Sequence, residues 1–340
     1  MRKAIVIGAG IGGLAAASLL AVRGYSVDVF EKNGTPGGKM QQVQSDKYRF
    51  DTGPSLFTMP FILERLFSEC SRSMNDYLEI TEPDPLCRYF YKDGVQFDSY
   101  TDREKAASEI RKFAAKDEKS YASFLDRAEE IYHKTSDAFI FNPLFALQDL
   151  KSLNLADFLD IDAFSTVSEV VDDYFTSPHL RQFFKRFATY NGSSPFQAPA
   201  TLNVIPHVEL NQGGYYVKGG LYKIALALEK LAREMGVRFH YRTAVSRILT
   251  DSSGAGGIET ANGDVHTSTI VVANSDASDT MLNLLPSDAV SGLKKARQSR
   301  IEPSCSGFVV LLGCKKLWPG LKHHNIFFSG DYRQEFDHIF

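Results

Sequence analysis

The chain has 340 residues, of which 44% are hydrophobic and 23% charged, and its formal net charge is -3 at pH 7. This composition is typical of a soluble globular protein, and the length favours two domains. A small negative net charge gives no basic stripe for nucleic acid, so we expect no nucleic-acid partner. No apolar run approaches the roughly 20 residues that span a bilayer, and the N-terminal sequence does not resemble a signal peptide.

The four cysteines are scattered and form neither a CxxC motif nor a Cys/His cluster. We therefore expect no disulfide framework and no metal site, and a reducing cytoplasm suits this cysteine usage.

The first thirty residues predict a β-α-β unit. Residues 3–7 (KAIVI) are a β-branched run typical of a strand buried on both faces of a parallel sheet. An Ala- and Leu-rich helix is expected over residues 14–23, with Gly24 as its C-cap. Residues 26–31 (SVDVFE) alternate as a second strand.

The rest of the chain changes character twice. Residues 34–60 are rich in Gly and Pro and are expected to be loops, whereas residues 61–135 and 164–190 are expected to be largely helical. The α/β pattern returns near residue 213. The further expected elements are a hairpin over residues 88–100 around Asp93-Gly94, an amphipathic helix over 221–235, a strand pair after it, a hairpin over 256–266 around Asn262-Gly263, and a buried strand over 269–273.

The glycine cluster after the first strand satisfies the G-x-G-x-x-G pattern, with Gly8, Gly10 and Gly13 at the required positions. In this pattern the first glycine makes the tight turn, the second lets the backbone approach a diphosphate, and the third lets the helix pack on the strand. Glu31 ends the second strand, where a carboxylate accepts the ribose hydroxyls and disfavours a 2′-phosphate. These features predict a dinucleotide site. Lys32 lies where it could cover the adenine end, with a solvated surface lysine as the alternative.

A second glycine-rich region favours FAD over NAD. Gly37-Gly38-Lys39 follows the acidic residue, and residues 51–55 (DTGPS) come after it. A flavin has to be held along its ribityl chain and ring edge, whereas an NAD domain needs no such loop. An ordinary surface loop remains the alternative.

The predicted fold class is therefore α/β, with a Rossmann-type FAD-binding domain and an inserted, largely helical and mixed-sheet (α+β) domain. The expected boundaries are residues 1–70 and 213–285 for the FAD-binding domain, and 71–212 and 286–340 for the substrate-binding domain.

Residues 6–39 followed by FDTGPS (residues 50–55) resemble the flavoprotein superfamily of amine oxidases, protoporphyrinogen oxidases and carotenoid desaturases. Residues 54–60, 187–200, 213–232 and 271–278 narrow this to a resemblance to the bacterial and fungal type of phytoene desaturase.

The resemblance implies roles for individual residues. Gly8, Gly10, Gly13 and Glu31 would bind the FAD diphosphate and adenosine ribose. The ribityl and flavin side would be lined by Gly38, Lys39, Gly53, Pro54 and Ser55, and the backbone of Val245 would meet the adenine. Asn274 and Asp276 follow the strand that returns to the flavin domain, where they are more simply turn residues. The full set of expected cofactor residues is Gly8, Ala9, Gly10, Gly12, Gly13, Glu31, Lys32, Gly38, Lys39, Gly53, Pro54, Ser55 and Val245.

The resemblance also implies a reaction and a location. The expected reaction removes two hydrogens from an acyclic or monocyclic carotene of the phytoene type, with the flavin carrying the redox chemistry. His207 and the pair His323-His324 are candidate bases, but structural histidines are the favoured interpretation and no catalytic residue is assigned. Because carotenoids are insoluble in water, we expect a cytoplasmic protein peripherally associated with the cytoplasmic membrane. Residues 137–153 are a candidate docking segment, with a tunnel lid or core helix as alternatives.

Three other functions stay open: a 1-hydroxycarotenoid 3,4-desaturase, a flavin amine oxidase, and a non-enzymatic prenyl-protein carrier. The family also returns to its flavin domain through a C-terminal glycine-rich segment, whereas this sequence ends at QEFDHIF. We therefore expect the chain to be truncated, which leaves open whether it binds FAD or is active alone.

Overall fold

The computed structural model describes residues 2–45, 47–142, 160–252, 254–301 and 303–340. The chain divides into two compact units, Met1–Thr81 with Tyr216–Pro303 and Glu82–Tyr215 with Ser304–Phe340. The sequence predicts boundaries between the two domains after residues 70, 212 and 285, whereas the chain passes between the two compact units after residues 81, 215 and 303. The assignment of a cofactor role to one part and a substrate role to the other stays a prediction.

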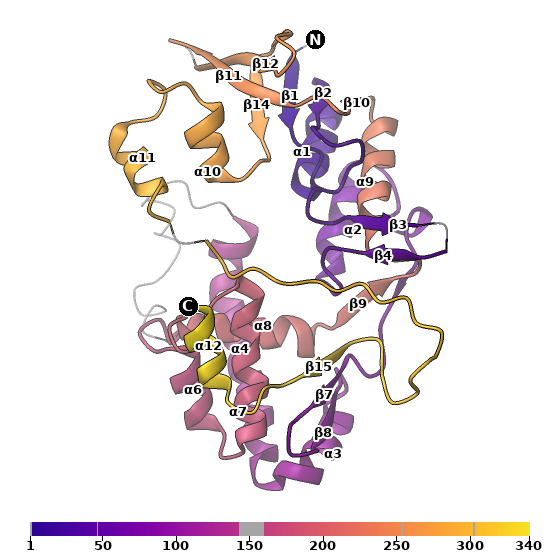
Figure 1. The fold of residues 1–340 in the computed structure, drawn as a ribbon, viewed down its shortest axis with the longest axis vertical. Coiled ribbons are helices and arrows are strands. Elements are labelled where there is room, and N and C mark those ends of the chain that lie inside the picture. Colours follow the sequence, from indigo (N-terminus) through magenta and orange to yellow (C-terminus); the bar gives the residue numbers. More distant parts are fainter. Residues whose placement is uncertain (1, 46, 143–159, 253, 302) are drawn as a thin grey trace. The chain divides into compact units, whose positions relative to one another are not determined.

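The first unit is built on a four-stranded parallel sheet (Figure 1). Its order is β10 (Arg238–His240), β2 (Ser26–Phe30), β1 (Lys3–Ile7) and β14 (Ile270–Ala273). The predicted strands at 3–7, 26–31 and 269–273 are all present. Because β1 lies inside the sheet, its β-branched residues are buried on both faces, which confirms the interpretation of KAIVI as a doubly buried strand.

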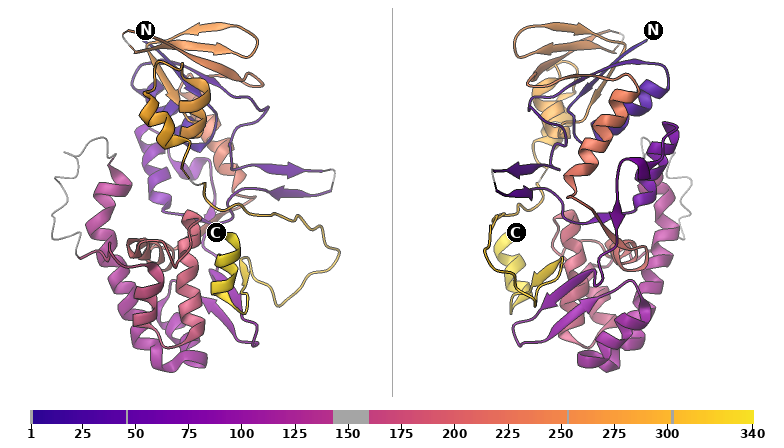
Figure 2. Two further views of the ribbon diagram at one scale, coloured as in Figure 1. Left: turned by 60° about the vertical axis from the view of Figure 1, so that its left-hand side comes forward. Right: turned by 90° about the vertical axis from the view of Figure 1, so that its right-hand side faces the viewer.

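Alternation along β1 separates two cores. Ala4 and Val6 face a cluster that includes the helices α1 (Ile11–Val22), α2 (Pro60–Glu69) and α9 (Tyr222–Glu234), and α1 lies beside α9 (Figure 2). Ile5 and Ile7 face the opposite cluster, with Ile248 and Ile258. The predicted α/β fold with a Rossmann-type core is confirmed.

Ile248 and Ile258 belong to an antiparallel sheet of β11 (Val245–Asp251), β12 (Gly254–Thr260) and β13 (Val265–Thr267). The predicted hairpin around Asn262-Gly263 is confirmed between β12 and β13. The predicted strand pair after α9 is wrong in its pairing, because β10 pairs with β2 and β11 pairs with β12. Strands β10 and β11 are neighbours in the sequence but belong to two different sheets.

The expectation of loops over residues 34–60 is partly wrong. Two short, largely exposed strands form a hairpin there, and they lack the long apolar run by which a strand is recognised. The remaining elements of this unit are β3 (Gln42–Gln44), β4 (Arg49–Asp51), β5 (Phe57–Thr58), β6 (Ile80–Thr81), β9 (Gly214–Val217), α10 (Ala277–Asp279) and α11 (Gly292–Gln298), with a 3₁₀ helix at Met74–Asp76 and a π-helix at Thr280–Leu284.

The second unit is largely helical and carries a mixed sheet of three strands, in the order β15-β7-β8. The β7–β8 hairpin confirms the prediction around Asp93-Gly94. The elements are β7 (Cys87–Phe90), β8 (Gln96–Ser99), α3 (Arg103–Ala114), α4 (Glu118–Ser136), α6 (Val167–Tyr174), α7 (Pro178–Lys185), α8 (Val204–Pro206), β15 (Asn325–Phe327) and α12 (Tyr332–Ile339), with 3₁₀ helices at Ala115–Asp117, Arg186–Asn191 and Ala200–Asn203 and π-helices at Asp137–Phe141 and His207–Asn211.

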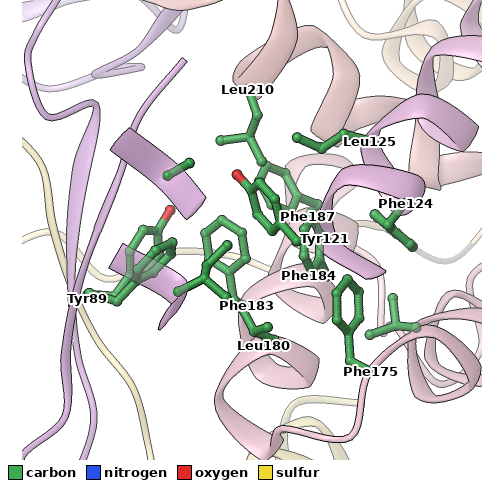
Figure 3. Close-up of a cluster of buried hydrophobic side chains, with 14 of the residues drawn as sticks. Tyr89, Tyr121, Phe124, Leu125, Phe175, Leu180, Phe183, Phe184, Phe187 and Leu210 are labelled. Atoms are coloured by element: carbon green, nitrogen blue, oxygen red, sulfur yellow. The ribbon is translucent and has the colours of Figure 1, made fainter. Parts of the chain in front are cut away.

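Aromatic side chains fill the core of this second unit (Figure 3). Phe184 contacts Phe124 and Phe175, with ring centroids 4.4 and 4.8 Å apart, and Phe183 meets Tyr89 edge to face. The high Phe and Tyr content of the sequence is thus explained in part by packing within this unit.

The candidate membrane segment at 137–153 lies outside the described residues from 143 onward. Within the described part of the chain, no helix combines the length and apolar character needed to cross a bilayer.

Candidate functional site

The glycine-rich turn joins β1 to α1. Gly8 has a φ of +95°, and a Cβ atom on Gly13 would lie 2.1 Å from the carbonyl oxygen of Gly8, so both positions require glycine. Helix α1 begins at Ile11, earlier than predicted, because its first turn contains two of the glycines. Gly10 at the N-cap has no side-chain cap, so the first N–H groups of α1 stay available for an anion.

Glu31 is buried just after β2 and binds the same turn. Its Oε2 accepts a hydrogen bond from the N–H of Ala9 at 2.8 Å, and its Oε1 accepts one from Asn33 at 2.8 Å. A carboxylate has further lone pairs on both oxygens, so it can also accept hydroxyl groups of a ligand.

The second glycine region lies directly against the first. The N–H of Gly37 donates to the carbonyl oxygen of Ala9 at 2.8 Å, and a Cβ on Gly38 would lie 3.1 Å from the Cα of Gly10. Gly37 itself cannot carry a Cβ, which would lie 2.1 Å from the carbonyl oxygen of Met40. Two loops that are well separated in the sequence therefore form one backbone cradle.

A cavity of about 880 Å³ opens over this cradle, within the size range of cofactor pockets. The expected residues that line it are Gly8, Gly10, Glu31, Lys32, Gly38, Lys39, Pro54 and Val245. The other expected residues, Ala9, Gly12, Gly13, Gly53 and Ser55, do not line it. Gly53 supports the wall, since a Cβ there would lie 2.4 Å from the carbonyl oxygen of Lys39.

Asn274 also lines the cavity, although the sequence favoured a simple turn role for it. It follows β14, and its N–H donates to Ile7 at 2.8 Å. Its side chain lies over the glycine turn, because a Cβ on Gly12 would be 2.7 Å from Nδ2 and one on Gly10 would be 3.1 Å from Oδ1. The signal that identifies this position is topological, since β14 and β1 are adjacent and their carboxyl ends meet at one edge.

Further lining residues were not expected from the sequence. They are Ile7, Ile11, Phe30, Asn33, Gly37, Met40, Ala244, Ser275, Asp276, Asp279 and Leu284, of which Gly37 and Asp276 were noted for their motifs alone.

The wall at Phe30 is fixed from behind by two histidines. Its ring stacks on His240 with centroids 4.5 Å apart and meets His266 at 4.7 Å. His240 Nε2 lies 2.8 Å from Asp28 Oδ1, and Arg238 makes a two-point ion pair with the same carboxylate. Burial opposes ionisation of Asp28, but the hydrogen bonds from Arg238 and His240 outweigh it and lower its pKa. This wall is therefore held by charge-assisted contacts.

The candidate histidines of the second unit form no catalytic arrangement with one another. His207 is buried, with Asn211 Nδ2 at 2.9 Å from Nδ1 and Gln212 Nε2 at 3.1 Å from Nε2. A neutral imidazole accepts a hydrogen bond at only one of its two nitrogens and donates at the other. One of the two amides must therefore turn its oxygen toward the ring. Gln212 is the candidate, because its Oε1 has no other partner among the described residues. Burial lowers the pKa of His207. Both nitrogens are engaged, which favours the structural interpretation.

The pair His323-His324 shows the same tendency. Burial lowers the pKa of both rings, and that of His324 falls to about 4 with the help of His323 and Arg186. No cluster of three or more metal-binding side chains occurs among the residues described.

The cavity has the donor set that a dinucleotide flavin needs. The N–H groups at the start of α1 suit a diphosphate, Glu31 suits ribose hydroxyls, and Lys32 and Lys39 add positive charge at the cavity wall. The N–H groups of Gly8, Ala9 and Gly37 are already donated to Phe30, Glu31 and Ala9, so these residues shape the turn. Two acidic residues that follow β14, Asp276 and Asp279, also line the cavity. The residues present fit FAD.

Comparison with known proteins gives consistent matches. The sequence profile described as flavin-containing amine oxidoreductase matches residues 11–304. The whole chain aligns at 39% identity with a 4,4'-diapolycopene oxygenase of Methylomonas, at 37% with a 1-hydroxycarotenoid 3,4-desaturase of Flavobacterium, and at 35% with a zeta-carotene-forming phytoene desaturase of Myxococcus xanthus. It spans 68%, 69% and 65% of their respective lengths.

A solved structure of an oxidoreductase from Methanosarcina mazei is similar in fold. Its TM-score is 0.61 at 20% identity, over 88% of this chain and 64% of that one.

Proposed function

The chain belongs to the flavin-containing amine oxidoreductase family, a family of FAD-dependent oxidoreductases, and we propose that it desaturates a carotenoid of the acyclic or monocyclic, phytoene type. The observation that carries the proposal is alignment of the entire chain, at 33–39% identity, with enzymes named for carotenoid desaturation or oxygenation. The diphosphate cradle supports it, because the redox chemistry needs a bound flavin.

We assign the cofactor residues as follows. Gly8 and Gly10 in the glycine turn, together with Ile11 at the start of α1, bind the diphosphate, and Glu31 binds the adenosine ribose. Gly38, Lys39 and Pro54 lie along the ribityl side, and Val245 lies at the adenine end. Ala9, Gly12, Gly13 and Gly53 shape the cradle from outside the cavity lining, and Ser55 adjoins it in sequence.

Bound FAD supplies a two-electron oxidation that takes two hydrogens from neighbouring carbons of the substrate and leaves a new double bond. The residues of this chain anchor and orient the cofactor. The Ala9–Glu31 and Ala9–Gly37 hydrogen bonds fix the loop spacing before the cofactor arrives, so less ordering is needed on binding.

We further propose that the protein works at the cytoplasmic membrane as a peripheral protein. The substrate class supports this, because a long polyene partitions into a bilayer and has to be taken from it.

Oxygenation of a carotenoid is a second candidate, favoured by the 39% identity with the diapolycopene oxygenase. The 3,4-desaturation of a 1-hydroxycarotenoid is equally consistent with the 37% relative. A flavin amine oxidase is supported by the family description alone. A prenyl-protein carrier that needs no flavin is disfavoured, because the chain belongs to a flavin-containing family.

The test is incubation of the FAD-loaded protein with phytoene, a monocyclic carotene, a 1-hydroxycarotenoid and an aliphatic amine in separate assays. Chromatography with absorption detection reads chain desaturation as a shift to longer wavelength, and mass spectrometry distinguishes loss of two hydrogens from gain of oxygen. Oxidation of the amine with every carotenoid unchanged would overturn the proposal.

A further inference from the structure

The stretch that contains α11 is an exposed basic surface in a chain that is acidic overall. Between Asp288 and Glu302 the sequence has four basic residues and no acidic one, whereas the whole chain has a net charge of -3. These residues are Lys294, Lys295, Arg297 and Arg300. None of them makes an ion pair with a residue that the structure describes; Lys295 Nζ instead donates to the carbonyl oxygen of Ser287 at 3.2 Å.

Large apolar side chains accompany these charges. Leu293 is 87% exposed and Ile301 is 54% exposed. A pairing of exposed apolar side chains with uncompensated cations is typical of segments that lie in a membrane interface.

The surface is connected to the cofactor cavity within the same unit. Gln298 Nε2 on α11 donates to Ser278 Oγ on α10 at 2.8 Å, and the two helices lie side by side (Figure 1). The segment that carries α10 also carries Asp276 and Asp279, which line the cavity, and Leu284 lines it from the adjoining π-helix. The chain segment that would contact the bilayer through α11 is therefore the same short segment that supplies part of the cavity wall.

A second exposed apolar segment is less suited to this role. Residues 303–314 form neither a helix nor a strand, and Phe308 among them is 95% exposed. Unpaired backbone groups resist transfer into hydrocarbon, whereas the backbone of a helix such as α11 is largely satisfied internally. Lys315 and Lys316 follow this segment and are exposed, which makes them a matched control.

We propose that the α11 surface, Leu293–Ile301, docks the protein on an anionic lipid membrane. Leu293 and Ile301 enter the interface, and the four cations contact lipid phosphates. The inference rests on the proposed function, since it names the surface through which a membrane-dissolved substrate is approached.

The test is sedimentation of the FAD-loaded chain with two kinds of vesicle, one of phosphatidylcholine alone and one of phosphatidylcholine with about 30% phosphatidylglycerol. The second lipid gives the vesicle a negative surface potential like that of a cytoplasmic leaflet. We expect binding to the anionic vesicles and its loss at high salt. The double variant Lys294→Glu/Arg297→Glu should weaken it by at least about 30-fold, the loss expected for two interfacial cations, because the new carboxylates also repel the anionic lipid. Lys315→Glu/Lys316→Glu, with the same change in charge, should weaken it much less.

Flavin absorbance measured in the same samples separates this inference from the proposed function. Normal flavin binding with no difference between the two double variants, or a larger loss in Lys315→Glu/Lys316→Glu, would overturn the α11 assignment while leaving the enzyme assignment intact. The α11 assignment would also be overturned if the protein bound to neither kind of vesicle and dimerised through α11.

Discussion

The carboxylate of Glu31 and the backbone N–H of Ala9 are joined by a buried hydrogen bond of 2.8 Å, across 22 positions of the sequence. This contact connects the end of β2 to the turn that follows β1. Glu31 is 5% exposed and therefore acts in the architecture of the turn as well as facing the cavity. The residue expected to recognise a ribose also sets the position of the loop expected to hold the diphosphate.

Replacing Glu31 should therefore affect both folding and cofactor binding. Glu31→Ala leaves the buried N–H of Ala9 without its acceptor, and we expect a loss of about 1–3 kcal/mol in the free energy of unfolding. FAD affinity, measured by flavin fluorescence, should fall as well. Glu64→Ala, at an exposed position of α2, is the control and should change neither quantity. Equal FAD affinity in Glu31→Ala and the parent would contradict the assignment.

The two glycines at the start of α1 should respond differently to alanine. A Cβ on Gly13 meets the backbone oxygen of Gly8 at 2.1 Å, whereas one on Gly12 meets the end of the Asn274 side chain at 2.7 Å. A side chain can move aside more easily than a backbone carbonyl. We expect Gly13→Ala to lower stability by about 1–3 kcal/mol and to weaken FAD binding, with a smaller effect for Gly12→Ala.

Thermal unfolding with and without FAD measures both effects. Gly320→Ala serves as a control, because a Cβ there contacts nothing within 4 Å. The reverse order, with Gly12→Ala the more damaging, would show that Asn274 cannot move.

The position of Asn274 predicts a charge effect. Its amide lies over the turn at which the diphosphate is expected, so Asn274→Asp would place an anion close to the ligand's own negative charge. We expect FAD binding to weaken about ten- to hundredfold. Asn274→Ala should have a smaller effect, and Asn262→Asp in the exposed β12–β13 turn should have none. Titration at two salt concentrations checks the electrostatic origin, since the deficit of Asn274→Asp should shrink at high salt.

The sequence predicts the first half of the cofactor site well because its signals are local. Strand, glycine turn, helix and acidic residue lie within thirty positions, and each has a stereochemical reason to be recognised. Asn274 and Asp279 reach the cavity only because β14 pairs with β1, a contact between residues about 265 positions apart that no local pattern contains. The same limit applies to β10, which pairs with β2 rather than with the strand that follows it.

The pKa of His324 predicts a pH dependence of stability. Burial, His323 and Arg186 lower this pKa to about 4, from about 6.5 for a free histidine. Above pH 6.5 the ring is neutral in both states. Between pH 6.5 and 4 the unfolded chain binds a proton that the folded chain does not, so stability falls as the pH falls.

Urea denaturation at pH 7, 6 and 5 measures this slope. His324→Gln should make it shallower. A variant slope identical to that of the parent would show that His324 does not contribute.

The buried pair Arg186–Glu209 should be important for the stability of the second unit. The two side chains are 11% and 4% exposed and lie 3.1 Å apart, and Glu209 also accepts a hydrogen bond from Tyr190. The guanidinium lies 4.3 Å from the ring centroid of Phe187. Removing one partner leaves an uncompensated charge in a low-dielectric core, so Arg186→Met or Glu209→Leu should each cost about 3–5 kcal/mol.

The double variant Arg186→Met/Glu209→Leu removes both charges and should recover part of this loss, because the desolvation cost disappears with the attraction. A double-mutant cycle from urea denaturation gives the coupling. The exposed pair Arg103–Asp126, at 45% and 60% exposure, is the comparison and should couple by at most about 1 kcal/mol. A coupling of that small size at Arg186–Glu209 would mean that water reaches the pair, and that the aromatic core around it is less tightly closed than its burial indicates.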